Sequence, residues 1–167
     1  MTAPPQLEEG EIAEAASLAR RAGRPTSAHA SGAEGIHRAV AAGVDFIEHA
    51  YFVEDDTLRL MAERGTVWTP TLAPVHAQWA HAGECGWSPE VAAGLRRILD
   101  RHAEQILLGR RLGVRILAGS DAGAPGVEQG RGLVLELELL AAVGIPVLEL
   151  LRGATRVAAD LLGAALG

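Results

Sequence analysis

The stretch TSAHASGAEGIHRAVAAGVDFIEHAYFVEDD, which runs from Thr26 to Asp56, decides how this chain folds. Residues 25–30 and 46–48 have the composition of short strands, and residues 32–42 place apolar side chains on one helical face. Gly43 stands where a helix C-cap is expected. A helix between two strands is the crossover that parallel neighbours require. The stretch therefore predicts a βαβ unit.

The same alternation of helix, glycine and strand continues along the chain. We expect helices at residues 8–22, 32–42, 57–64, 90–112 and, in two or three segments, 133–166. The expected strands lie at residues 25–30, 46–48, 66–69 and 114–118. Residues 74–89 and 119–132 contain glycines and prolines, and we expect them to be irregular. The repeats predict a parallel sheet of about four βα units.

The positions of the polar residues favour one of the two folds that such repeats allow. A doubly wound sheet and a TIM barrel both fit, but the polar residues follow the strands, at His29, His49, Thr69–Thr71 and Asp121. Side chains at these positions meet at the C-terminal face of a barrel. A complete barrel has eight strands and about 250 residues. We therefore predict an α/β fold, a partial TIM (β/α)8 barrel in one domain over residues 1–167.

Composition narrows the classes of partner. The formal net charge of -6 offers no positive surface for nucleic acid or for an anionic membrane. The apolar stretch Leu133–Leu151 is interrupted by glutamates, and Cys85 has no second cysteine with which to form a disulfide within the chain. No signal peptide is visible after Met1. We expect a cytoplasmic protein that binds a small molecule, with no nucleic-acid or membrane partner.

Two histidines and one aspartate are the candidate metal ligands. His29 and His49 end neighbouring strands about 4.8 Å apart, so their imidazoles can share one ion. Asp121 closes an apolar strand among small residues, where a carboxylate can bind metal and accept a proton from activated water. A single histidine at a strand end is more often a hydrogen-bonded structural residue. The three residues together predict a metal site.

Several motifs of the chain resemble those of one known family, the metal-dependent amidohydrolases of the imidazolonepropionase-like and Xaa-Pro-dipeptidase-like branch. The motifs are Ala28-His29-Ala30 with Gly32–Ile36, Gly43–His49, Thr69–Leu72, Leu117–Gly123, Gly153–Thr155 and Ala158–Gly163. The resemblance implies that His29 and His49 bind metal at the ends of the fifth and sixth barrel strands. It also implies that Asp121, after the eighth strand, binds metal and acts as general base.

The resemblance implies a reaction and a cofactor as well. The expected reaction is hydrolysis of an amide-type C–N bond in a cyclic amide or a dipeptide, with His49 as a second group that can polarise the carbonyl. We expect one or two divalent ions, zinc before manganese, iron, cobalt or nickel, because imidazole and carboxylate ligands suit zinc.

Three parts of the family pattern have no counterpart in this sequence. They are the first-strand His-X-His pair, the bridging Lys or Glu, and a β-rich segment after the Leu-Leu-Gly motif at Leu161–Gly163. The resemblance therefore predicts an incomplete C-terminal half with little hydrolase activity by itself. The alternative is a non-catalytic half-barrel or truncated fragment. Such a chain would form a homodimer through its open sheet edges or complement an N-terminal half.

The other four histidines are expected to lie outside the site. His37 falls on a helix, His76 and His81 fall in the stretch expected to be irregular, and His102 is expected to be a solvated residue of the long helix. Arg131 could pair with a substrate carboxylate or simply face solvent.

Overall fold

Four short strands form one parallel sheet in the described part of the chain, which comprises residues 4–161 and residue 163 of this computed structural model. The strands are β1 (Ser27–Ala30), β2 (Phe46–His49), β3 (Val67–Thr69) and β4 (Arg115–Ile116), in the spatial order β1-β2-β3-β4. Every pair is parallel. The predicted α/β class with a parallel sheet is therefore confirmed.

The chain divides into two compact units. The first comprises Met1–Pro70 with Leu108–Leu117 and contains the sheet. The second comprises Thr71–Leu107 with Ala118–Gly167. Helix α5 (Pro89–Leu112) gives its last turn to the first unit and the rest to the second.

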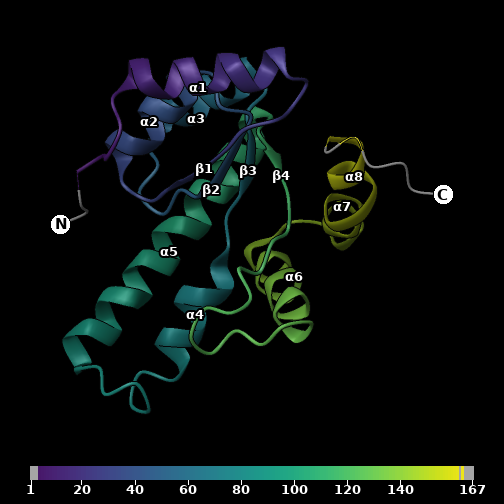
Figure 1. Cartoon of the computed structure of the whole chain (residues 1–167). Coiled ribbons are helices and arrows are strands. Elements are labelled where there is room, and N and C mark those ends of the chain that lie inside the picture. Colours follow the sequence, from purple (N-terminus) through teal and green to yellow (C-terminus); the bar gives the residue numbers. More distant parts are fainter. Residues whose placement is uncertain (1–3, 162, 164–167) are drawn as a thin grey trace. The chain divides into compact units, whose positions relative to one another are not determined.

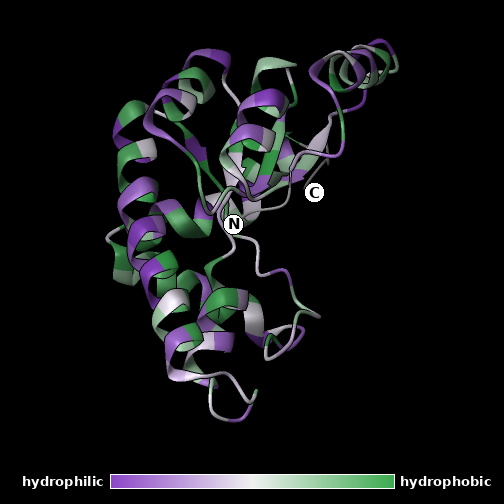
Figure 2. Ribbon diagram, turned by 90° about the vertical axis from the view of Figure 1, so that its left-hand side faces the viewer, coloured by the Kyte–Doolittle hydropathy of each residue, from purple (hydrophilic) through white to green (hydrophobic). Residues whose placement is uncertain are grey.

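In the first unit, α1 (Glu9–Arg21), α2 (Ala33–Ala41) and α3 (Asp55–Arg64) lie side by side next to the sheet (Figure 1). Purple and green bands alternate along the helices in Figure 2, as amphipathic helices require. The fully buried side chains of this unit include Ile36, Val40, Ile47, Leu58, Met61 and Trp68. The core thus lies between the helices and the strands that carry the two histidines.

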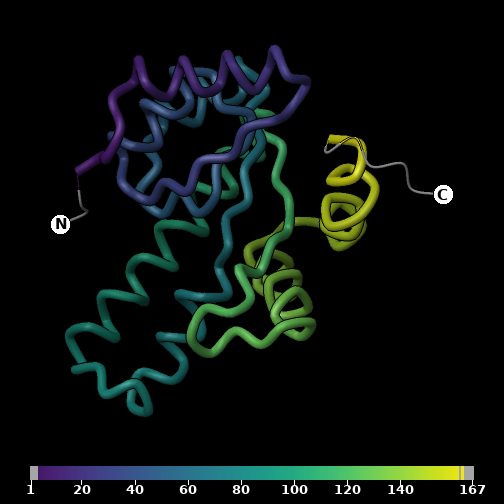
Figure 3. The backbone as a smooth tube through the Cα atoms, viewed as in Figure 1, coloured from purple at the N-terminus to yellow at the C-terminus, as the bar shows by residue number. Residues whose placement is uncertain are grey.

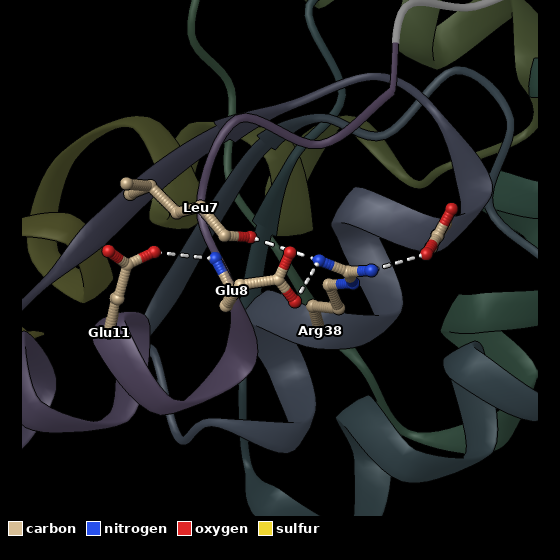
Figure 4. Close-up of polar contacts among 5 residues, drawn as sticks. Leu7, Glu8, Glu11 and Arg38 are labelled. Carbon is tan, nitrogen blue, oxygen red and sulfur yellow. Dashed lines mark hydrogen bonds and ion pairs between the residues drawn. The ribbon is translucent and has the colours of Figure 1, made fainter.

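A surface network joins the start of α1 to α2 (Figure 4). The Arg38 guanidinium donates to the Leu7 carbonyl at 3.2 Å, to the Glu8 carboxylate at 2.9 Å and to Glu34 at 2.6 Å. The hydrogen bond to Glu34 is the largest cause of a raised Arg38 pKa. The Glu8 N–H donates to the Glu11 carboxylate at 2.8 Å, which satisfies a backbone donor at the beginning of α1. These contacts fix the segment that precedes α1.

The second unit contains the remaining helices. They are α4 (Leu72–Ala80), the first part of α5, α6 (Arg131–Val143), α7 (Val147–Arg152), a π-helical turn at Gly153–Val157 and α8 (Ala158–Leu161). Figure 3 traces, in green, the loop of residues 118–130 into α6. Val127 of this loop packs with Ala73 and Ala77 of α4. A Cβ added at Gly132 would lie 2.7 Å from Val127 Cγ1, so a larger residue there would displace the Val127 side chain.

Two expected elements differ from the structure. Residues 72–80 are helical as α4, although most of them fall in the stretch 74–89 expected to be irregular. Pro74 lies in the first turn of this helix, where its missing N–H costs nothing. The fourth strand is limited to Arg115–Ile116, and one more ladder bond follows, from the Leu117 N–H to the Trp68 carbonyl at 2.9 Å. Val114 and Ala118, the two ends of the expected strand, lie outside β4.

None of the helices in the described residues has both the length and the apolar character that crossing a membrane requires.

Candidate functional site

His29 and His49 meet at the carboxyl ends of β1 and β2. His29 Nδ1 lies 2.7 Å from His49 Nε2, and the two rings are edge to face with centroids 4.3 Å apart. His29 is exposed, whereas His49 is only 6% exposed. The structure therefore brings these two predicted residues together, with one ring nitrogen of each directed at the other.

The backbone after β2 turns sharply to bring His49 into this position. In the parallel register Ala30 pairs with His49, and β2 ends there. His49 and Ala50 have φ angles of 71° and 53°, in the left-handed region that non-glycine residues rarely adopt. The indole N–H of Trp68 donates to the His49 carbonyl at 2.9 Å, and the Ala50 N–H donates to the Ala30 carbonyl at 2.9 Å. These bonds hold the turn.

Further groups surround the histidine pair. The Tyr51 ring stacks on His49 with centroids 5.7 Å apart. Ser27 lies two residues before His29 on β1, and Glu48 directly precedes His49 on β2. The Ser27 hydroxyl donates to the Glu48 carboxylate at 2.7 Å. A cavity of about 390 Å³ adjoins β1, lined mainly by apolar side chains of the first unit and also by His29. The exposed histidine therefore borders a space large enough for a small molecule.

The donor set of the pair fits a divalent ion such as zinc. Imidazole nitrogen is a preferred zinc ligand at about 2.1 Å, and two ligands at a tetrahedral angle would stand about 3.4 Å apart. At 2.7 Å the two nitrogens are at hydrogen-bond distance, so sharing an ion requires the rings to separate by about 0.7 Å. Among the described residues of the first unit, no third His, Cys, Asp or Glu joins the pair.

Asp121 belongs to the second unit, in the loop between β4 and α6. Its side chain is exposed, its carbonyl accepts the Ala124 N–H at 3.2 Å, and its φ of 49° is left-handed. The described non-glycine residues with positive φ are His49, Ala50, Thr71 and Asp121. Strained backbone of this kind concentrates at functional sites. The role of Asp121 as a partner of the two histidines stays a prediction.

Glu136 is a notable polar residue that the sequence reasoning did not select. It is completely buried on α6, where its two carboxylate oxygens accept the Leu72 N–H at 3.0 Å and the Ala73 N–H at 2.7 Å. Burial raises the pKa of Glu136 to about 7, although the two amide donors act in the opposite direction. A signal was present in the sequence, because Glu136 shares a helical face with Gly132 and Leu140, four residues away on either side.

The expectation for His102 is wrong. This residue is completely buried in α5 instead of solvated. His76 lies on α4, and its pKa is lowered, first by burial and then by Arg96 and His81. His37 Nδ1 lies 3.2 Å from the Thr57 hydroxyl. These contacts explain His37 without a catalytic role.

Comparison with known proteins identifies the family. Residues 2–167 match the model of the amidohydrolase family. An uncharacterized protein of Mycobacterium tuberculosis is 31% identical over 150 residues, which cover 90% of this chain and 40% of that protein. The crystal structure of a Xaa-Pro dipeptidase with bound methionine is 28% identical with a TM-score of 0.77, over 98% of this chain and 40% of that one. Ochratoxinase of Aspergillus niger is 29% identical with a TM-score of 0.77, over 90% and 34%.

The chain therefore belongs to the amidohydrolase family, and the predicted resemblance to its Xaa-Pro-dipeptidase-like branch is confirmed. It spans 40% of the length of the mycobacterial relative that it matches.

Proposed function

We propose that this chain carries metal ligands and the general base of a hydrolase that cleaves amide-type C–N bonds. The observation that carries the proposal is the 2.7 Å approach of His29 Nδ1 to His49 Nε2 at the ends of two neighbouring parallel strands. Membership of the amidohydrolase family supports the type of reaction. The likeness to a Xaa-Pro dipeptidase supports a dipeptide as substrate over a cyclic amide.

We further propose that the four strands correspond to strands five to eight of a TIM barrel. The purely parallel order β1-β2-β3-β4 supports this assignment, as does the match to 40% of the Xaa-Pro dipeptidase chain. In such a barrel His29 and His49 belong to the carboxyl ends of strands five and six. Asp121 follows strand eight at the same face.

Each proposed residue has a distinct role. His29 and His49 would hold a divalent ion, for which zinc is the first candidate. Such an ion, when bound, polarises a carbonyl and lowers the pKa of water. Asp121 accepts a proton from the attacking water and delivers it to the leaving nitrogen. The hydrogen bond from the Trp68 indole N–H to the His49 carbonyl helps to fix the His49 backbone.

The test is release of free proline from Xaa-Pro dipeptides by the 167-residue chain supplied with zinc, manganese or cobalt. We expect slow release that a chelator abolishes, because few ligands hold the ion. His49→Ala and Asp121→Asn should remove the release, and His81→Ala should retain it, since His81 pairs with Glu84 outside the proposed site.

Two results would count against the proposal. Release that persists in Asp121→Asn would exclude the proposed general base. A chain that binds metal but releases no proline in any of these conditions would favour the alternative, a non-catalytic half-barrel. Far-ultraviolet circular dichroism of each variant separates these results from loss of folding.

A further inference from the structure

The Glu136 carboxylate occupies an unusual place at the start of α4. The Leu72 and Ala73 N–H groups belong to the first turn of this helix, where no carbonyl of the same helix can accept them. The N-cap residue Thr71 makes no side-chain capping bond. The two acceptors come instead from Glu136, at 3.0 Å and 2.7 Å, from a helix more than 60 residues further along the chain.

The backbone that these bonds hold is strained. Thr71 is buried and has a φ of 54°, in the left-handed region. A non-glycine residue in this conformation costs on the order of 1 kcal/mol and persists only where its surroundings fix it. Hydrogen bonds from backbone amides to a carboxylate are stronger than those between neutral groups, and the helix N-terminus favours the negative charge. Glu136 therefore supplies an anchor directly after Thr71.

No charged neighbour is among the causes of the raised pKa of Glu136. The causes of its raised pKa are burial first, followed by the opposing amide bonds from Leu72 and Ala73, and no ionisable neighbour is among them. Ionisable residues on the helices of this unit include His76 on α4, Arg96, Asp100 and His102 on α5, Arg131 and Glu138 on α6, and Glu149 and Arg152 on α7. Burial is therefore the main factor that determines the pH range in which the Glu136 carboxyl group is protonated.

We propose that Glu136 is a positioning residue: its carboxylate holds the backbone of Thr71–Ala73 in the turn that opens α4, and protonation of the carboxylate loosens that turn. The charged group accepts one N–H at each oxygen. A protonated oxygen carries a hydrogen of its own, so it accepts poorly from the amide that faces it. Because burial raises the pKa of Glu136 to about 7, this change falls near neutral pH.

The inference does not rest on the proposed hydrolase function, and its test needs neither metal nor substrate. Hydrogen exchange of the Leu72 and Ala73 amides is followed by NMR between pH 5.5 and pH 8.5, with correction for intrinsic exchange. In the unaltered chain we expect the protection of at least one of these amides to rise about tenfold over this range, the equivalent of one hydrogen bond.

Glu136→Gln gives the decisive comparison, because glutamine has a similar shape and only one acceptor oxygen. We expect one of the two amides to exchange about tenfold faster at pH 8.5 than in the unaltered chain, with no pH dependence. Glu138→Gln, an exposed neighbour on the same helix, is the matched control and should behave as the unaltered chain.

Protection that is independent of pH in the unaltered chain would overturn the inference. So would a Glu136→Gln profile identical to that of Glu138→Gln. If Glu136→Gln does not fold, the pH series on the unaltered chain decides alone, with the carbon-13 shift of the Glu136 carboxyl group as second readout. A midpoint shared by that shift and the amide protection supports the inference, and separate midpoints contradict it.

Discussion

Replacing Glu136 by glutamine should remove much of the pH dependence of the chain's stability near neutral pH. The pKa of Glu136 is raised from 4.5 to about 7 in the folded chain, so the folded state binds the proton more tightly than the unfolded state does. The stabilising contribution is therefore complete below pH 4.5 and is lost as the pH rises through 7. The difference between a pKa of 4.5 and one of about 7 corresponds to roughly 3 kcal/mol, at 1.36 kcal/mol for each pKa unit.

The measurement is urea unfolding at pH 5 and pH 8.5 for the unaltered chain, Glu136→Gln and Glu138→Gln. Between these two pH values the unaltered chain and the Glu138→Gln control should lose about 2 to 3 kcal/mol more of their unfolding free energy than Glu136→Gln does. Protonation of Glu136 should thus raise the unfolding free energy of the whole chain while it lowers the protection of a Leu72 or Ala73 amide. The two effects differ in sign because protonation removes the cost of burying a charge but weakens one hydrogen bond from an amide. Equal pH dependence in all three proteins would refute the reasoning.

Three further substitutions have expected outcomes in urea unfolding. Trp68→Phe removes the N–H that donates to the His49 carbonyl and should cost about 1 to 3 kcal/mol, a loss that an unchanged midpoint would contradict. Gly132→Ala should cost about 1 to 3 kcal/mol, because the new Cβ would lie 2.7 Å from Val127 Cγ1. Gly10→Ala, in α1 with open space around it, should instead stabilise by up to about 1 kcal/mol, and destabilisation would show that packing there is tighter than the structure indicates.

Local sequence signals are sufficient to predict most helices and strands of the first unit. Gly43 and Gly65 end helical patterns, and α2 and α3 lie within two residues of their expected bounds. The fourth strand was less predictable, because its length depends on its neighbour β3, which pairs with it only at Val67 and Trp68. Helix α4 is harder to predict, because the glycines and prolines of residues 74–89 favour irregular structure, whereas Pro74 lies in the first turn of the helix and does not interrupt it.

Some features of the candidate site and its surroundings can likewise be predicted from the sequence, and others cannot. The approach of His29 to His49 follows from the parallel register of β1 and β2, which the alternation of strand and helix already predicts. The helical pattern places Glu136, unlike Glu138, on the same face as Gly132 and Leu140, but it does not predict what the Glu136 carboxylate contacts. Those contacts depend on the position of the α4 backbone, whose Leu72 and Ala73 amides need acceptors.

The shared ion at His29 and His49 is tested most directly by calorimetric titration of the metal-free chain with zinc. One zinc ion per chain should bind, and His29→Ala and His49→Ala should each weaken binding at least about tenfold, because each removes one imidazole ligand. His81→Ala should bind as the unaltered chain does. Equal zinc affinity in the unaltered chain, His29→Ala and His49→Ala would contradict the metal site and, with it, the proposed function.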